Sequence, residues 1–323
     1  MSVGPTSRST PPVLASPQPT RPTPLGQNVV VNMATGAAAS VVFQPVAVLM
    51  TTVFEQHGKQ SASAALRERF ARSGVLGTVW GAKLSSMSAG MRRGLKLGGL
   101  AGMGGLIHRT FPEFSAQHPT TANAFIGLMV GVAEGVVSTP VDVGAQRMME
   151  ATPAGKQAHG SVAQTARWLM SSKLSLSFAG VVPSVLRFGS MNMVIAAGLP
   201  MMQNTVRRSF PDMNPIAQNG LAMLGTSFWA CMGFGGFWDL ITVQQRRAAL
   251  DGAPKSLMQI VRGVFIHSVE SHVLNGVPRP LATVVGPARV VFGAGLARFI
   301  NAGPPFALGF AGAVELNRWL NSL

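Results

Sequence analysis

The stretch GVAEGVVSTPVDVGAQRMM, residues 131–149, decides which fold the chain is expected to adopt. An apolar, glycine-bearing run reaches Pro140, and the chain continues through Asp142 to Arg147. A proline kinks a membrane helix without ending it when neighbouring segments satisfy the freed backbone groups. The stretch therefore predicts a kinked, membrane-spanning helix with an acid and a base near its end.

Two degenerate copies of this stretch lie elsewhere, at Gln44-Pro45-Val46-Ala47 and at Phe237-Trp238-Asp239. Each copy is followed by an amphipathic segment and then by a glycine turn that precedes a second apolar run. The amphipathic segments are residues 60–73, 161–170 and 256–273, and the turns are at Gly81, Gly180 and Gly276. Equivalent positions recur every 95–99 residues, which indicates one span–surface helix–span unit copied around an axis.

The composition fits a membrane protein. Of 323 residues, 47% are hydrophobic and only 11% are charged, whereas about 25% are charged in soluble domains. The net charge of +15 favours anionic lipid head groups over nucleic acid, because the bases flank apolar runs and no basic helix face carries aromatics.

No enzyme site or cofactor is expected. The single Cys231 excludes an internal disulfide and a cysteine-based metal cluster. No histidine pair has metal-ligand geometry, and the chain has no nucleophile elbow or phosphate loop. We therefore predict no catalytic residue and no metal site.

The repeats resemble the mitochondrial carrier family over about residues 28–300. In that family each odd helix ends in Pro-x-acid-x-x-base. Pro140, Asp142 and the nearby Arg147 match the middle copy, and Phe178-Ala-Gly180 matches the turn before an even helix.

Three further stretches are similar to the oxodicarboxylate and citrate carriers of that family. They are Gly131-Val-Ala-Glu134-Gly, Arg92-Arg93-Gly-Leu-Lys96 and Arg187-Phe-Gly189-Ser-Met-Asn192.

The resemblance implies an all-α membrane protein with six transmembrane helices in three tandem repeats. Three short matrix-side amphipathic helices complete a pseudo-threefold barrel. The expected divisions are a Pro-rich extension (1–27), repeats at 28–115, 116–211 and 212–303, and a C-terminal extension (304–323). The last boundary assumes that Gly303-Pro304-Pro305 breaks the sixth span; alternatively, Phe306–Leu320 is the true end of that helix.

The signature motifs are degenerate. The family's acid positions hold Ala47, Asp142 and Asp239, and its basic positions hold Met50, Ala145 and Thr242. The resemblance implies a gate at Pro45, Pro140, Asp142 and Asp239. Because no base remains at the signature positions, the two aspartates need other partners.

Arg92, Lys96 and Arg187 admit two interpretations. Arginine and lysine bind carboxylates, and a charge inside a membrane is a functional hypothesis by default. These three residues would then bind a di- or tricarboxylic acid. In the other interpretation they neutralise Asp142, Asp239 and Glu134 within the bundle. Arg289 and Arg298, on the sixth span, are expected to snorkel to the membrane interface.

Two functions follow from the resemblance. The first is a transport-inactive accessory subunit of a larger complex of the mitochondrial inner membrane, such as a respiratory-chain complex, that binds other subunits through its terminal extensions. The alternative is an active exchanger of oxo-, di- or tricarboxylates by alternating access. Bound cardiolipin is expected at Gly81, Gly180 and Gly276, as in the family. Bases concentrate after the odd spans, so the positive-inside rule predicts an N-terminus in the intermembrane space.

Overall fold

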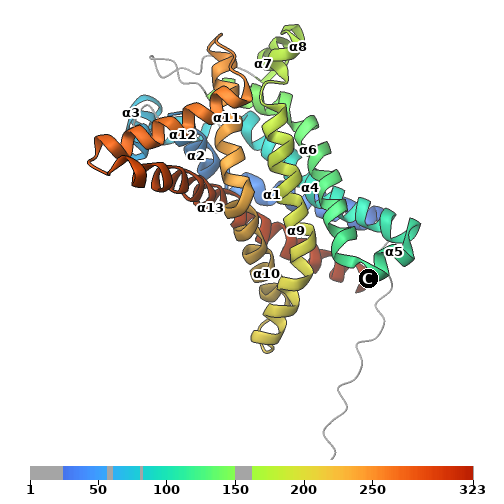
Figure 1. Ribbon diagram of the computed structural model, residues 1–323. Coiled ribbons are helices and arrows are strands. Elements are labelled where there is room, and N and C mark those ends of the chain that lie inside the picture. The colour runs from blue at the N-terminus through green and yellow to red at the C-terminus, as the bar shows by residue number, and fades with distance from the viewer. Residues whose placement is uncertain (1–24, 57–60, 81–82, 150–161, 323) are drawn as a thin grey trace, which may run out of the picture.

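The structure is a computed structural model that describes residues 25–56, 61–80, 83–149 and 162–322 (Figure 1). This part of the chain is helical and contains no strand. The predicted all-α class is therefore confirmed.

Long helical segments form the body of the molecule. They are α1 (Leu25–Val42) continued by α2 (Gln44–Glu55), α4 (Lys83–Thr110), α6 (Pro119–Met149), α9 (Val181–Ser209), α10 (Pro215–Ala230) continued through a π-turn, η1 (Cys231–Gly235), into α11 (Gly236–Leu250), and α13 (Arg279–Ser322). Shorter helices connect them: α3 (Ala62–Trp80), α5 (Pro112–Gln117), α7 (Val162–Ser171), α8 (Leu174–Ser177) and α12 (Leu257–Leu274).

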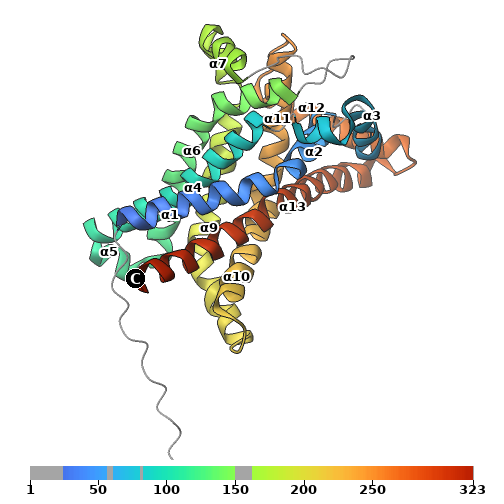
Figure 2. The ribbon, with the colours of Figure 1, turned by 180° about the vertical axis from the view of Figure 1, so that it is seen from behind.

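The long helices close a ring, and Figure 2 shows its first helix, α1, beside its last, α13. In chain order α1, α4, α6, α9, α10 and α13 each pack on the next, and α13 packs back on α1. Two side-chain hydrogen bonds tie the chain ends of this ring together: Gln27 Nε2 to Asn321 Oδ1 at 3.3 Å, and Asn317 Nδ2 to Asn28 Oδ1 at 3.1 Å. The first and last long helices therefore begin and end at the same end of the bundle.

Glycine spacing explains the close contact between α6 and α9. Gly127, Gly131 and Gly135 lie four residues apart, so they share one face of α6. A Cβ at Gly135 would lie 2.8 Å from the Cα of Val185, and one at Gly131 would overlap the backbone of Phe188. Small residues let helix backbones approach closely in membrane proteins, and the glycines of α6 allow the same close approach to α9.

The predicted amphipathic segments are helices, namely α3, α7 and α12. They gather with α2 and α11 at one end of the molecule, opposite the chain ends (Figures 1 and 2). Gly180 and Gly276 have φ of 77° and 82°, a left-handed conformation that glycine adopts without strain. Gly81 lies outside the described residues.

Within the described ranges, three segments are long and apolar enough to cross a membrane: Pro119–Arg147, Leu174–Ser209 and Arg279–Ser322. They correspond to the third, fourth and sixth expected spans. The other expected spans are less regular in the described residues. The first is interrupted at Phe43 between α1 and α2, and the fifth contains η1. The second, α4, carries Arg92, Arg93 and Lys96.

The expectation that Gly303-Pro304-Pro305 ends the sixth span is wrong, because α13 continues without a break from Arg279 to Ser322. A proline at position 305 lacks the N–H that would bond to the carbonyl of Asn301. The side chain of Arg93 supplies a replacement, since its Nη2 donates to Asn301 O at 3.1 Å. Residues 304–322 of the proposed extension are therefore the end of a 44-residue helix.

Candidate functional site: a buried layer of arginines and carboxylates

The expected gate residues lie where the long helices depart from regular α-helical geometry or begin anew. Pro45 occupies the first turn of α2, where its missing N–H removes no intrahelical bond. Pro140 lies inside α6, two residues before Asp142. Asp239 lies in the first turn of α11, directly after the π-turn. Both aspartates are buried.

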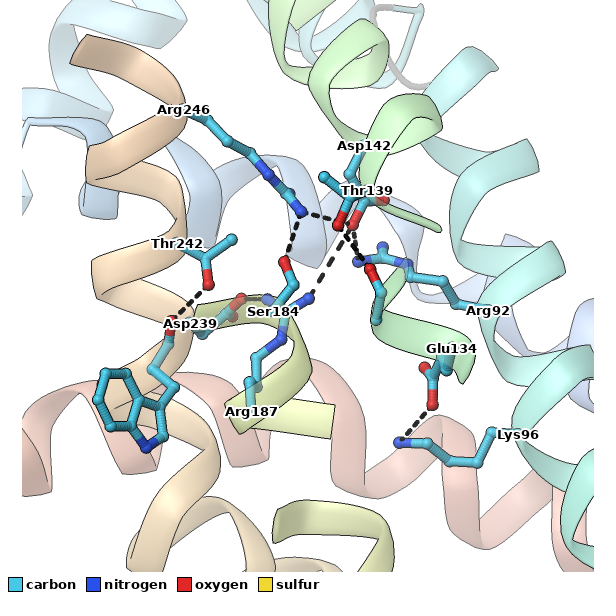
Figure 3. Close-up of polar contacts among 12 residues, drawn as sticks. Arg92, Lys96, Glu134, Thr139, Asp142, Ser184, Arg187, Asp239, Thr242 and Arg246 are labelled. Atoms are coloured by element: carbon cyan, nitrogen blue, oxygen red, sulfur yellow. Dashed lines mark hydrogen bonds and ion pairs between the residues drawn. The ribbon is translucent and has the colours of Figure 1, made fainter. Parts of the chain in front are cut away.

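Asp142 is the centre of a cluster of guanidinium groups (Figure 3). Its Oδ2 lies 3.2 Å from Arg92 Nη1 of α4, 3.2 Å from Arg246 Nη2 of α11 and 4.0 Å from Arg187 Nη2 of α9. Arg246 Nη2 also donates to the hydroxyl of Ser184 at 2.8 Å. One carboxylate thereby joins four helices.

Asp239 has its own pair of arginines. Its Oδ1 accepts from Arg187 Nη1, and its Oδ2 accepts from Arg298 Nη1 of α13 at 3.2 Å. Arg187 faces both aspartates and is 1% exposed. It connects the two carboxylates into one network. We call this network the charge layer; it consists of Arg92, Asp142, Arg187, Asp239, Arg246 and Arg298.

Backbone contacts extend the network around the ring. Gln146 Nε2 of α6 donates to Val243 O of α11 at 3.2 Å, and Gln244 Nε2 of α11 donates to Phe54 O of α2. These bonds tie the ends of α2, α6 and α11 to one another, at the end of the molecule where α3, α7 and α12 lie (Figure 1).

A second pair lies beside this layer. Lys96 Nζ is 3.8 Å from Glu134 Oε2, which also accepts from Asn192 Nδ2 at 2.9 Å. The ammonium group lies 4.3 Å from the ring centroid of Phe306 and 5.6 Å from that of Phe188. Cation–π contact with a desolvated ring adds to the stabilisation of this buried charge.

The structure therefore places all three predicted cations, Arg92, Lys96 and Arg187, in ion pairs with Asp142, Asp239 and Glu134. This is the neutralising arrangement that the sequence left open. The interfacial position expected for Arg298 is wrong: the residue is 8% exposed and pairs with Asp239.

Sequence reasoning missed Arg246 and Arg298 as partners of the aspartates. A signal for Arg246 was present, because it lies four residues, about one helical turn, after Thr242, which holds the basic signature position. No spacing rule pointed to Arg298, because it lies outside the motif.

A small cavity opens among these groups. Arg92, Arg187, Arg246 and Arg298 line it together with Asp142 and Asp239, among other residues, and its volume is about 50 Å³. Pockets for small molecules usually measure about 300–1,000 Å³. A second cavity of about 320 Å³ lies nearer the chain ends, lined mostly by apolar residues and asparagines such as Asn28, Asn32 and Asn317.

No protein-family profile matches this chain, and no curated protein matches it either. Among the described residues, no three His, Cys, Asp or Glu side chains are grouped to hold a metal ion. The geometry of the site holds charged helices together and presents cations to a small cavity.

Proposed function

We propose that this chain is a carrier-like protein of the mitochondrial inner membrane that does not transport and serves as a structural subunit of a larger membrane complex. The observation that carries the proposal is the pairing of Arg92, Lys96 and Arg187. Each cation that would recognise a carboxylate substrate is engaged by a carboxylate of the chain itself.

The ring supports the six-span arrangement of this proposal. The start of α1 and the end of α13 lie at the same end of the bundle, and a chain with both ends on one side crosses an even number of times. With the positive-inside rule, those ends face the intermembrane space and α3, α7 and α12 face the matrix.

The turns at Gly180 and Gly276 support cardiolipin binding. Gly180 is the N-cap residue of α9, and Gly276 lies just before α13. Free N–H groups and the helix dipole at such termini attract phosphate groups. The lipid would bind at the matrix-side rim of the ring.

The small volume between the aspartates favours a structural role over exchange. A cavity of about 50 Å³ does not admit a six-carbon tricarboxylate, and entry would require several buried ion pairs to separate. Breaking a buried pair costs about 3–5 kcal/mol. A conformational cycle that opens the layer would have to offset this free energy for each ion pair that separates.

Reconstitution in cardiolipin-containing liposomes tests this proposal. We expect no uptake of labelled oxoglutarate or citrate above protein-free liposomes. In a mild detergent extract of the native membrane, we expect the chain to migrate in a high-mass complex. Uptake that Arg187→Ala abolishes would establish an exchanger and refute the structural role, and recovery only as a monomer would remove the proposed complex.

A further inference from the structure

The cavity between the two aspartates carries more positive than negative charge. Four arginines, Arg92, Arg187, Arg246 and Arg298, line it against the two carboxylates, so its described lining has a net charge of +2. The neighbouring group does not offset this excess, because Lys96 balances the single carboxylate of Glu134 and the buried Arg93 adds a further cation.

Several N–H groups of these arginines have no acceptor among the residues that the structure describes. They are Nε and Nη2 of Arg187, Nε of Arg246 and Nε of Arg298, each buried and without a hydrogen bond. Arg187, Arg246 and Arg298 are all more than nine-tenths buried. A buried donor that lacks an acceptor costs about 1–3 kcal/mol, and more when it is charged.

Water alone does not solve this problem. A cavity of about 50 Å³ has room for roughly three to five water-sized atoms, since one water needs about 10–15 Å³. Water oxygens would accept from the free N–H groups, but they would leave the charge of +2 uncompensated. Uncompensated charge is costly at membrane depth.

We propose that the layer contains a binding site for a small dianionic oxyanion of the phosphate or sulfate type, held by Arg187, Arg246 and Arg298 with Arg92 beside them. Such an ion has about as many oxygens as the cavity has positions, and two negative charges match the excess. Planar guanidinium groups bind oxyanions in bidentate fashion.

This site goes beyond the structural role proposed above, because the anion is a bound component of the layer and not a cargo. With the anion in place, the arginines cross-link α4, α9, α11 and α13 through a common centre. The ion would therefore stabilise the closed ring.

Thermal unfolding of the purified full-length protein in detergent tests the site. Sodium phosphate and sodium sulfate are titrated against sodium chloride at equal ionic strength. A ligand that binds only the folded state raises the midpoint as its concentration passes its dissociation constant. We expect phosphate and sulfate to raise the midpoint and chloride to leave it unchanged.

Variants on α13 locate the effect. Arg298→Gln removes one lining charge, and Asp239 keeps Arg187 as a partner; the half-saturating phosphate concentration should rise roughly tenfold or more, as for the loss of one charge-assisted hydrogen bond. Arg298→Lys keeps the charge and should lie between wild type and Arg298→Gln. Arg289→Gln, an exposed arginine of the same helix, should bind phosphate like wild type.

The outcomes separate this site from the structural proposal. Equal midpoints in phosphate and chloride would overturn the site even if no variant folds, and so would an equal loss of phosphate binding in Arg298→Gln and Arg289→Gln. Binding without liposome uptake supports both proposals. Binding with uptake of labelled phosphate would keep the site and overturn the non-transporting role.

Discussion

Asp142→Asn is the most direct test of the charge layer. The substitution keeps the shape of the side chain and removes the charge that faces Arg92, Arg246 and Arg187. Removing one partner of a buried ion pair costs about 3–5 kcal/mol, because the other charge stays buried and uncompensated. For a chain of this size each kcal/mol lowers the unfolding midpoint by roughly 2 °C, so we expect a loss of about 6–10 °C.

The single cysteine provides the assay. Cys231 is the only cysteine of the chain and is 0% exposed, so a fluorogenic thiol reagent reacts with it only when the ring opens. Heating the detergent-solubilised protein with this reagent gives the midpoint. The matched control is Asp251→Asn, whose pair with Arg247 is exposed; surface pairs of this kind contribute about 0.3–0.5 kcal/mol.

One result would refute the reasoning. If Asp142→Asn and Asp251→Asn unfold at the same temperature, the buried pairs contribute no more than surface pairs, and the layer does not hold the ring together. A double variant, Asp142→Asn with Arg246→Gln, sharpens the test. We expect it to lose less than the sum of the two single losses, because the cycle measures their direct interaction.

Three other outcomes are expected from the same thermal assay. Gly131→Ala should lower the midpoint by several degrees because its Cβ meets the backbone of α9, whereas Gly104→Ala meets nothing within 4 Å and should be neutral or stabilising. Lys96→Met should destabilise by leaving Glu134 without its cation, and adding Glu134→Gln should recover part of the loss. Deleting the chain from Pro304 onward should prevent stable folding, while tolerance of that deletion would show that the end of α13 is a dispensable extension.

The sequence was sufficient for the helical class, for the helical state of α3, α7 and α12, and for the set of residues from which the layer draws its acids. These features are written in local periodicity and in repeated spacing. The pairing of Asp142 with Arg246 of α11 is not written in local periodicity. The two residues lie 104 positions apart, and whether they meet depends on how the two helices are rotated about their axes.

The two prolines of α13 show the same limit. Judged from local sequence, Pro304 and Pro305 predict the end of a helix. This prediction was wrong, because α13 continues through both prolines. The helix nevertheless continues, and Arg93 of α4, a side chain from another helix, donates to the Asn301 carbonyl in place of the missing backbone N–H. Tertiary contacts of this kind lie outside any window of sequence.

The closure of the ring also has a consequence for how the protein is made. The contacts of Gln27 and Asn28 with Asn317 and Asn321 join residues almost 300 positions apart. Translation delivers α1 almost 300 residues before the end of α13, so the nascent chain stays open beside α1 until α13 has been made. During that interval the apolar face of α1 that α13 later covers needs another apolar neighbour, such as lipid or a second protein that binds the unfinished chain.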